Sequence, residues 1–264
     1  TLAEIRTEQQ GALRSGRPTG CRFLRAHLEG PFLNARFKGA HDERTFLDPS
    51  IEVADTLVST GEVGFVTLAP ELPGALELVA RLAEAGVCVA IGHTQASDEV
   101  LDAAVRAGAR LSTHLGNGSH LVLPRLANYV QTQLADDRLL ATFIADGHHV
   151  PFPTLQNFLR AKTPARSILV TDAIVAAELG PGRHTAGGRA VVVAPDGRTS
   201  QPGREYLAGS VLTLDRAVLN VCRRCGVPFE QAWAMASTHP AAAVGLPAPP
   251  EVAVRVTEEG FAAA

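Results

Sequence analysis

The sequence predicts an α/β protein in which helices cover a parallel sheet, and three observations support this prediction. Short apolar runs alternate with stretches that carry apolar residues at helical spacing, which is typical of strand–helix units. The strand-like runs are apolar without interruption, as expected for strands buried on both faces. Polar residues gather just after these runs, at the strand ends where such proteins place their active sites.

The elements follow each other regularly along the chain. After a first apolar strand within residues 21–28, the predicted strands are Gly61–Thr67, Val87–Ile91, Arg110–Thr113, Leu140–Ala145 and Ser167–Thr171. The predicted helices are Pro73–Ala85, Asp98–Ala107, Thr154–Ala161, Thr213–Arg224 and Pro228–Ser237. A proline opens the first of these helices and Gly86 follows it, while Ser97 caps the second and Gly108 stops it. A hairpin is expected around Pro195-Asp196-Gly197.

The polar residues distinguish a barrel from an open sheet. Five of them lie at, or one loop past, the carboxyl end of a different strand: Glu29, His93, His114, His149 and Asp172. A barrel brings such ends around one mouth, whereas an open sheet spreads them along a line. The sequence has neither a G-x-G-x-x-G motif nor a P-loop, which weakens a nucleotide-binding open sheet. We therefore predict a TIM-type (β/α) barrel, incomplete because about six of the eight expected strands are visible.

We expect one domain over residues 1–264, with a hairpin insertion at residues 174–206 and a tail at residues 246–264. The net charge of −3 and the 46% of hydrophobic residues argue against disorder and against nucleic-acid or membrane-surface partners. No apolar run reaches the roughly 18 residues of a membrane helix, and no signal-peptide pattern opens the chain. Because the only Met is Met235, we expect a processed chain or a fragment.

Four cysteines are too few for a disulfide scaffold in a chain of this length. Cys222 and Cys225 have the C-x-x-C spacing of zinc or redox sites, but no second pair accompanies them. We expect ordinary thiols in a reducing cytoplasm.

Glu29, His93 and His114 have the chemistry of a metal site. Two neutral imidazoles and a carboxylate form a common zinc set, and three protein ligands leave one position open for water. The metal then lowers the pKa of that water towards about 7 and polarises a carbonyl. Each residue alone also fits a structural role: Glu29 as a turn carboxylate on backbone amides, each histidine as a satisfied core residue. Asp172 fits both a helix N-cap and a catalytic base.

A further group could bind a substrate. Asn117 and Gly118 lie in a glycine-rich loop that can offer backbone N–H groups to an anion. Arg125 suits a bidentate phosphate or carboxylate contact, and it equally suits a solvated surface. His41 and the pair His148-His149 add hydrogen-bonding groups.

At these residues the chain resembles the N-acetylglucosamine-6-phosphate deacetylases of the amidohydrolase superfamily. The matching segments run in the family's order through nearly the whole chain: HLEGPFLN (27–34), KGAH (38–41), GHT (92–94), THLGN (113–117), ADGHHV (145–150), LVTDA (169–173), LAGSVLTL (207–214) and ASTHPAAAVG (236–245). Each segment alone is weakly specific, but together they are highly specific.

The resemblance implies a metal-assisted deacetylation that yields acetate and glucosamine 6-phosphate. Glu29, His93 and His114 would hold one divalent ion, zinc by preference, and Asp172 would be the general acid and base. His149 would polarise the carbonyl or steady the tetrahedral intermediate. The implied substrate contacts are Asn117, Gly118 and Arg125 for the phosphate, Ala40 and His41 for the sugar, and Ala208, Gly209 and Ser210 for the acetamide. Family members are commonly dimeric, which implies a homodimer.

The chain also departs from the family. Nothing before Glu29 matches the first barrel strand with its His-x-His pair, so a second metal ion is not expected, and the family's β-sandwich domain is largely missing. The segment THLGNGSHLVLPRL differs from the commoner THLFNAM form where it would face the substrate. Two alternatives therefore stay open: an amidohydrolase acting on another acylated sugar or cyclic amide, and an inactive truncated barrel.

Overall fold

The structure is a computed structural model that describes residues 7, 24–204, 206–249, 253–257 and 261–263. Cys21 and the start of the first predicted strand lie outside the described residues. Cys88, Cys222 and Cys225 are free thiols, and burial raises the pKa of each, which disfavours the reactive thiolate. None of the described helices is both long and apolar enough to span a membrane.

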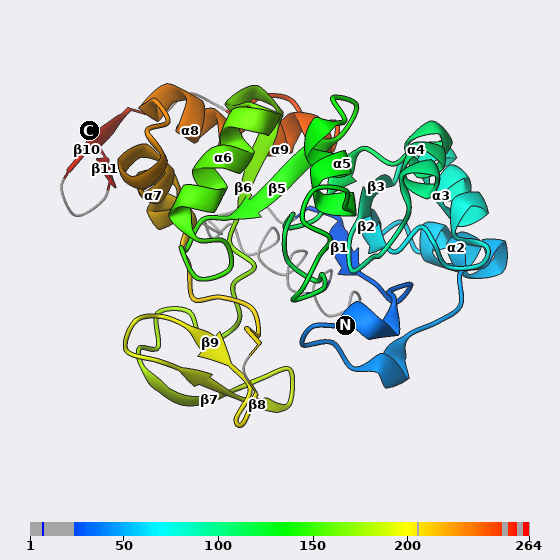
Figure 1. The fold of residues 1–264 in the computed structure, drawn as a ribbon, viewed down its shortest axis with the longest axis horizontal. Helices are drawn as coiled ribbons and strands as arrows, with labels where there is room; N and C mark the ends of the chain where they lie inside the picture. Colours follow the sequence, from blue (N-terminus) through cyan, green and yellow to red (C-terminus); the bar gives the residue numbers. More distant parts are fainter. Residues whose placement is uncertain (1–6, 8–23, 205, 250–252, 258–260, 264) are drawn as a thin grey trace.

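Six parallel strands form the main sheet (Figure 1). They are β1 (Ala26–Glu29), β2 (Val63–Leu68), β3 (Cys88–Ile91), β4 (Leu111–Ser112), β5 (Leu140–Ile144) and β6 (Ser167–Val170). Each strand pairs with the next in chain order. Within the described residues no pairing joins β6 back to β1, so the sheet is curled but open. This confirms the predicted incomplete TIM-type barrel.

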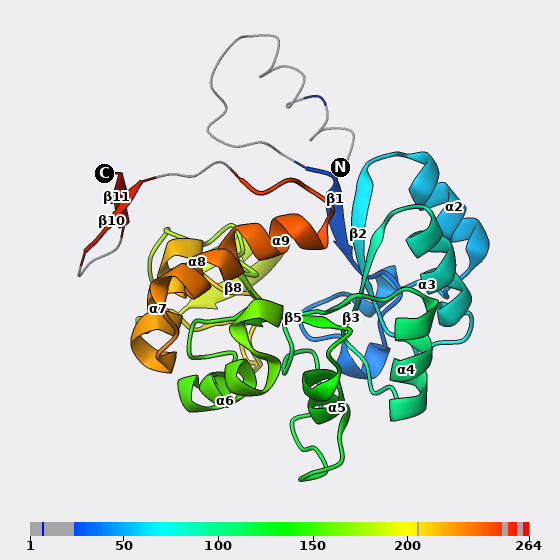
Figure 2. The same ribbon diagram turned by 90° about the horizontal axis from the view of Figure 1, so that it is seen from above.

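Helices cover the outer side of this sheet (Figure 2). They are α2 (Ile51–Ser59), α3 (Ala75–Glu84), α4 (Asp98–Ala107), α5 (Tyr129–Ala135), α6 (Phe152–Lys162), α7 (Leu214–Cys225), α8 (Phe229–Ala236) and α9 (Thr238–Ala243). Short 3₁₀ turns lie at η1 (Ala35–Phe37), η2 (Glu43–Thr45) and η3 (Pro164–Arg166). The helix expected from Thr154 begins at Phe152, because a proline is tolerated in the first turn. As predicted, the Ser97 side chain caps α4 and Gly108 ends it.

A second, antiparallel sheet lies on the side of the carboxyl strand ends (Figure 1). It consists of β7 (Gly182–Ala186), β8 (Arg189–Val193) and β9 (Thr199–Ser200), in that order. The turn between β8 and β9 falls at the predicted Pro195-Asp196-Gly197, where Gly197 takes a positive φ of 88°. A short hairpin of β10 (Val254–Val256) and β11 (Phe261–Ala263) stands apart from the barrel (Figure 2).

Among the described residues, one lysine is fully buried in the core between the sheet and the helices. Lys162, at the end of α6, is fully buried, and its Nζ donates to the backbone carbonyls of Gln133 (2.8 Å) and Asp136 (2.6 Å). These carbonyls lie at the carboxyl end of α5, where the helix dipole favours a positive charge. Burial nevertheless lowers the pKa of Lys162 to about 8. The lysine fixes α5, which carries the loop of residues 116–128 on its amino end.

Candidate active site

The backbone places three of the predicted site residues in an unusual conformation. His93, His114 and Asp172 have positive φ values of 50°, 28° and 49°, and each lies just after the end of a strand. Only two other non-glycine residues in the described chain share this feature. Such conformations cost free energy and persist where the surrounding structure fixes them, and they concentrate at functional sites. The three residues therefore mark this end of the sheet as a candidate functional site.

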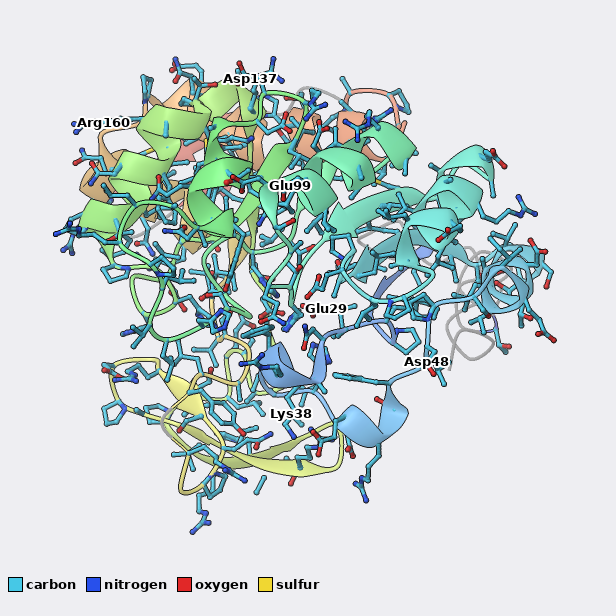
Figure 3. The ribbon with its side chains drawn as sticks, turned by 45° about the vertical axis from the view of Figure 1, so that its right-hand side comes forward. Glu29, Lys38, Asp48, Glu99, Asp137 and Arg160 are labelled. Atoms are coloured by element: carbon cyan, nitrogen blue, oxygen red, sulfur yellow. The ribbon has the colours of Figure 1, made fainter. Side chains whose placement is uncertain are left out.

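Glu29 lies at the centre of the site. Its Oε1 lies 2.8 Å from Nε2 of His93 and 2.6 Å from Nε2 of His114, and its Oε2 lies 3.5 Å from Nε2 of His41. Glu29 ends β1, whereas the two buried histidines follow β3 and β4. Figure 3 shows Glu29 in the middle of the molecule, with Lys38 on the segment that follows β1. The structure therefore brings the three predicted metal ligands together.

The proton arrangement of His93 suits a cation at this point. Its Nδ1 lies 2.6 Å from the carbonyl oxygen of Phe37, which can only accept a hydrogen bond, so Nδ1 carries the proton. In the neutral ring Nε2 then carries a lone pair, and it faces a carboxylate oxygen of Glu29. Two acceptors this close need a shared cation, either a proton or a metal ion. The residues therefore fit a divalent cation, with a backbone carbonyl fixing the tautomer as in known metal sites.

The pKa values of Glu29 and His114 reflect the contact between these two side chains. Burial opposes ionisation of Glu29, but the hydrogen bonds from His114, His41 and His93 outweigh it and hold the pKa of the carboxyl well below its usual range. Burial also opposes the charge on His114, yet the contact with Glu29 gives a net rise of its pKa. Glu29 is thus ionised at neutral pH.

His41, which the resemblance assigns to the sugar, also lies beside Glu29 and His93. Potential ligand atoms of Glu29, His41 and His93 all fall within 4.8 Å of one another. The His41 and His93 rings also meet edge to face, with centroids 5.0 Å apart. His41 is therefore available both to a cation and to a substrate bound above it.

A cavity of about 1070 Å³ opens over the site. Its lining includes Glu29, His93, His114 and Asp172, together with the predicted substrate residues Ala40, His41, Asn117, Gly118, His149, Ala208 and Gly209. Desolvation within the cavity raises the pKa of Asp172, opposed by His114 and reinforced by Glu29. The pKa of this carboxyl therefore lies above the ordinary value of an aspartate.

Asp146 orients His149. The two side chains share a 2.6 Å contact between Nδ1 of His149 and Oδ2 of Asp146, while Oδ1 accepts from the backbone N–H groups of His148 and His149. Asp146 follows β5 in the sequence, at the same kind of position as the other site residues. The sequence offered this signal, but Asp146 was not among the predicted site residues.

Two predicted substrate residues lie elsewhere. Arg125 is exposed on the loop before α5 and is not among the residues that line the cavity. Ser210 is buried, and its hydroxyl donates to the carbonyl of Thr171. Its backbone N–H and C=O bind Asp172 O (2.8 Å) and Ile174 N (3.0 Å), so Ser210 holds the loop that carries Asp172. Their roles as direct substrate contacts stay predictions.

Cationic groups that the sequence did not single out line the cavity. They are Arg36, Lys38, Arg189 and Arg204. Arg189 pairs with Asp42 at 2.9 Å and Lys38 with Glu43 at 3.0 Å. Arg36 is exposed and precedes Phe37, whose ring lies 4.3 Å from that of His120 on the Asn117–Gly118 loop. Arg36 and the Asn117–Gly118 loop are far apart in the sequence, so only the fold shows that they lie near each other.

Comparison with known proteins finds deacetylases that resemble this chain. The chain is 38% identical over 244 residues to the N-acetylglucosamine-6-phosphate deacetylase of Bos taurus, an alignment that covers 89% of this chain and 59% of the relative. The chain is a homologue of these deacetylases. The N-acetylgalactosamine-6-phosphate deacetylase of Escherichia coli O157:H7 is 35% identical over 230 residues, covering 86% of this chain and 60% of that enzyme. No model of a known protein family matches the sequence.

Solved deacetylase structures share the fold. The N-acetyl-D-glucosamine-6-phosphate deacetylase of Mycobacterium smegmatis, solved as a mutant with N-acetyl-D-glucosamine-6-phosphate, superposes with a TM-score of 0.79 at 33% identity. The match covers 84% of this chain and 60% of that one. The chain thus spans about three fifths of the length of the deacetylases that it matches, and the cluster around Glu29 lies within it.

Proposed function

We propose that this chain is a metal-dependent hydrolase that removes the acetyl group from N-acetylglucosamine 6-phosphate. The observation that carries the proposal is the meeting of Glu29, His93 and His114 in one cavity with Asp172. The homology to deacetylases supports the same reaction. In this proposal the three ligands hold one zinc ion, and Asp172 is the general acid and base.

The chemistry divides between the cation and the side chains. When bound, a divalent cation supplies Lewis acidity, which lowers the pKa of water and polarises a carbonyl. The Asp172 carboxylate accepts a proton from the water that adds to the amide carbon. It then gives this proton to the nitrogen as the C–N bond breaks, which releases acetate and the free sugar amine. The raised pKa of Asp172 suits both halves of this transfer.

His149 assists from the side of the carbonyl. Asp146 accepts from its Nδ1–H and fixes the orientation of the ring, so that Nε2 is the nitrogen left to face the carbonyl oxygen of the substrate. Gly118 offers its backbone N–H to the phosphate, with Arg36 or Arg125 as its cationic partner. Asn117 offers the second hydrogen of its side-chain amide, because its backbone N–H already donates to the carbonyl of His114 (2.9 Å). Ala40 and His41 contact the sugar, and Ala208 and Gly209 enclose the acetyl group.

The same site could accept the galactosamine epimer of this sugar, because one relative is named for that substrate.

We infer from the anionic substrate, which does not cross a lipid bilayer unaided, that the chain works in the cytoplasm. We also propose a single barrel domain with an insertion at residues 174–206 and a tail at residues 246–264. A homodimer is proposed on the exposed apolar side chains of Leu121, Val122 and Leu126, which a second copy could cover.

One experiment tests the central proposal. Purified protein is loaded with Zn²⁺ and acetate release is measured from N-acetylglucosamine 6-phosphate, its galactosamine epimer and the unphosphorylated sugar. We expect release from a phosphorylated sugar that a chelator abolishes and added Zn²⁺ restores. A folded, zinc-loaded chain that releases no acetate from any of them contradicts the proposal, as does release that survives chelation.

A further inference from the structure

Glu71 connects three loops that follow neighbouring strands. The residue comes just after β2, and its Oε1 accepts hydrogen bonds from Nδ2 of Asn34 (2.8 Å) and from the backbone N–H of Gln95 (2.8 Å). Its Oε2 accepts from the hydroxyl of Thr94. Asn34 follows β1, whereas Thr94 and Gln95 follow β3. One carboxylate therefore ties the loops of β1, β2 and β3 together.

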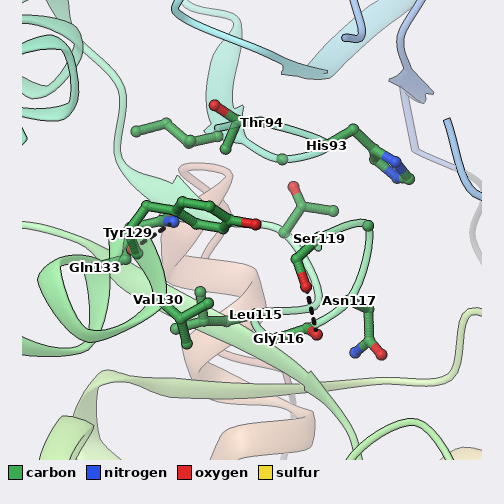
Figure 4. Close-up of a pocket in the computed structure, with 13 residues that line it drawn as sticks. His93, Thr94, Leu115, Gly116, Asn117, Ser119, Tyr129, Val130 and Gln133 are labelled. Atoms are coloured by element: carbon green, nitrogen blue, oxygen red, sulfur yellow. Dashed lines mark hydrogen bonds between the residues drawn. The ribbon is translucent and has the colours of Figure 1, made fainter. Parts of the chain in front are cut away.

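The first consequence concerns the backbone of His93. This residue has a φ of 50°, a conformation that the chain leaves unless its neighbours hold it. The next two residues, Thr94 and Gln95, are the ones bound by Glu71. Figure 4 shows Thr94 and His93 on one loop, with their side chains leaving it in different directions. Glu71 thus fixes the loop at the two residues that follow His93.

The second consequence concerns the partner of the His93 ring. Asn34 uses its side-chain oxygen to cap η1 through the N–H of Arg36 (3.0 Å). η1 ends at Phe37, and the carbonyl of Phe37 is the acceptor for Nδ1–H of His93 (2.6 Å). The N–H of Asn34 also donates to the carbonyl of His93 at 3.3 Å. Both the backbone that carries the ring and the carbonyl that orients it are therefore anchored at Glu71.

We propose that Glu71 is a positioning residue that sets the orientation of His93, with Nδ1–H on the Phe37 carbonyl and Nε2 directed at Glu29. Glu71 is not among the residues that line the large cavity, so it acts through Thr94, Gln95 and Asn34 and not on the substrate. This inference rests on the proposed function, because it assigns a supporting residue to the same cation site. Partners of this kind change metal affinity by about 10–100-fold when removed.

Three variants separate positioning from a general effect on folding. Glu71→Ala removes all three hydrogen bonds. Glu71→Gln keeps one side-chain oxygen, which can accept from Asn34 and Gln95. Its NH₂ group takes the place of Oε2 and can donate to the oxygen of the Thr94 hydroxyl. Glu77→Ala removes an exposed carboxylate six residues further on, in the first turn of α3, and serves as the matched control.

Two readouts are measured at a temperature well below the melting transition. The first is the His93 Nδ1–H resonance in ¹H–¹⁵N spectra of the metal-free full chain, which reports the bond to the Phe37 carbonyl. The second is Zn²⁺ affinity from competition with a chelator, together with the visible spectrum of the Co²⁺-loaded protein. We expect Glu71→Ala to lose the resonance, to weaken Zn²⁺ binding about 10–100-fold and to shift the Co²⁺ bands. Glu71→Gln should stay within about threefold of the wild type, and Glu77→Ala should match it.

Each other outcome overturns the inference. An unchanged resonance and affinity in Glu71→Ala contradict it, and so does a loss in Glu77→Ala as large as that in Glu71→Ala. If Glu71→Ala does not fold, Thr94→Val removes the bond to Oε2 together with the bond that the hydroxyl accepts from the N–H of Ala96 (2.9 Å). This variant should weaken Zn²⁺ binding by about threefold or more, and an unchanged affinity overturns the inference. A wild-type chain that binds no divalent ion refutes the proposed function, while the metal-free resonance still tests the role of Glu71.

Discussion

Substitution of Gly118 by alanine should damage the cation site although Gly118 is not among its ligands. A Cβ built on Gly118 would lie 2.7 Å from Nδ1 and 2.8 Å from Cε1 of His93. The ring cannot easily yield, because it is 5% exposed and held by Phe37 on one nitrogen and Glu29 on the other. The added methyl group therefore collides with the imidazole ring itself, and either the ring or the loop that carries residue 118 must move.

The size of the effect follows from two contributions. Gly118 has a φ of 56°, so an alanine there costs about 1–2 kcal/mol in backbone conformation wherever it occurs. The second contribution is specific to this position: ordinary van der Waals contact begins near 3.4 Å, so ring and loop must separate by about 0.7 Å. A shift of that size would stretch the 2.6 Å bond to the Phe37 carbonyl to the edge of hydrogen-bonding distance. We therefore expect Zn²⁺ affinity to fall by about tenfold or more.

Gly61 provides the matched control for this prediction. It has a φ of 67°, and a Cβ on it would meet nothing within 4 Å. Gly61→Ala should therefore lower the free energy of unfolding by the same conformational cost of about 1–2 kcal/mol and leave Zn²⁺ affinity unchanged. Urea unfolding and chelator competition measure the two quantities. If Gly118→Ala and Gly61→Ala behave alike in both assays, the reasoning about the His93 contact is refuted.

Three further predictions concern catalysis, stability and phosphate binding. Asp172→Asn should lower kcat by about 10²–10⁴ while the bound zinc content stays the same, and a variant with wild-type kcat would exclude Asp172 as the proton carrier. Lys162→Met should cost about 2–4 kcal/mol in urea unfolding because two carbonyls of α5 lose their donor. Since burial lowers the pKa of Lys162 to about 8, the unfolded chain binds the extra proton above that pH. The free energy of unfolding of the wild type should therefore rise relative to that of Lys162→Met between pH 8 and the ordinary lysine pKa near 10.5. The slope should reach up to about 1.4 kcal/mol per pH unit, and a difference between the two proteins that does not change with pH would contradict this prediction. Arg36→Ala should raise KM for the phosphorylated sugar about tenfold or more, with Arg125→Ala as the comparison, and the larger rise in KM identifies the phosphate partner.

The sequence was sufficient to predict that the three proposed ligands would meet. Glu29, His93 and His114 follow apolar strands, and parallel strands bring their carboxyl ends to one side, so their convergence follows from topology alone. The residues that orient these ligands are harder to predict. Glu71 and Asp146 follow strands in the same way, but an isolated carboxylate after a strand also fits a turn or a helix cap. Only the hydrogen bonds across loops distinguish these roles.

The residues of the proposed reaction all lie at one end of the open barrel. Every group in the proposed reaction lies at the end of a described strand or on the loop that follows it: Glu29 on β1, His93 after β3, His114 after β4, His149 after β5 and Asp172 after β6. β3, β4, β5 and β6 are consecutive neighbours in the sheet. β2 lies between β1 and β3, and the loop after β2 supplies Glu71. The contacts that hold the site join the end of β1 to the loops after β3 and β4 through Glu29, and the loops after β1, β2 and β3 through Glu71. None of these contacts requires β6 to pair with β1. For this reason we expect metal binding to depend on the contacts between these loops more than on the two free edges of the sheet.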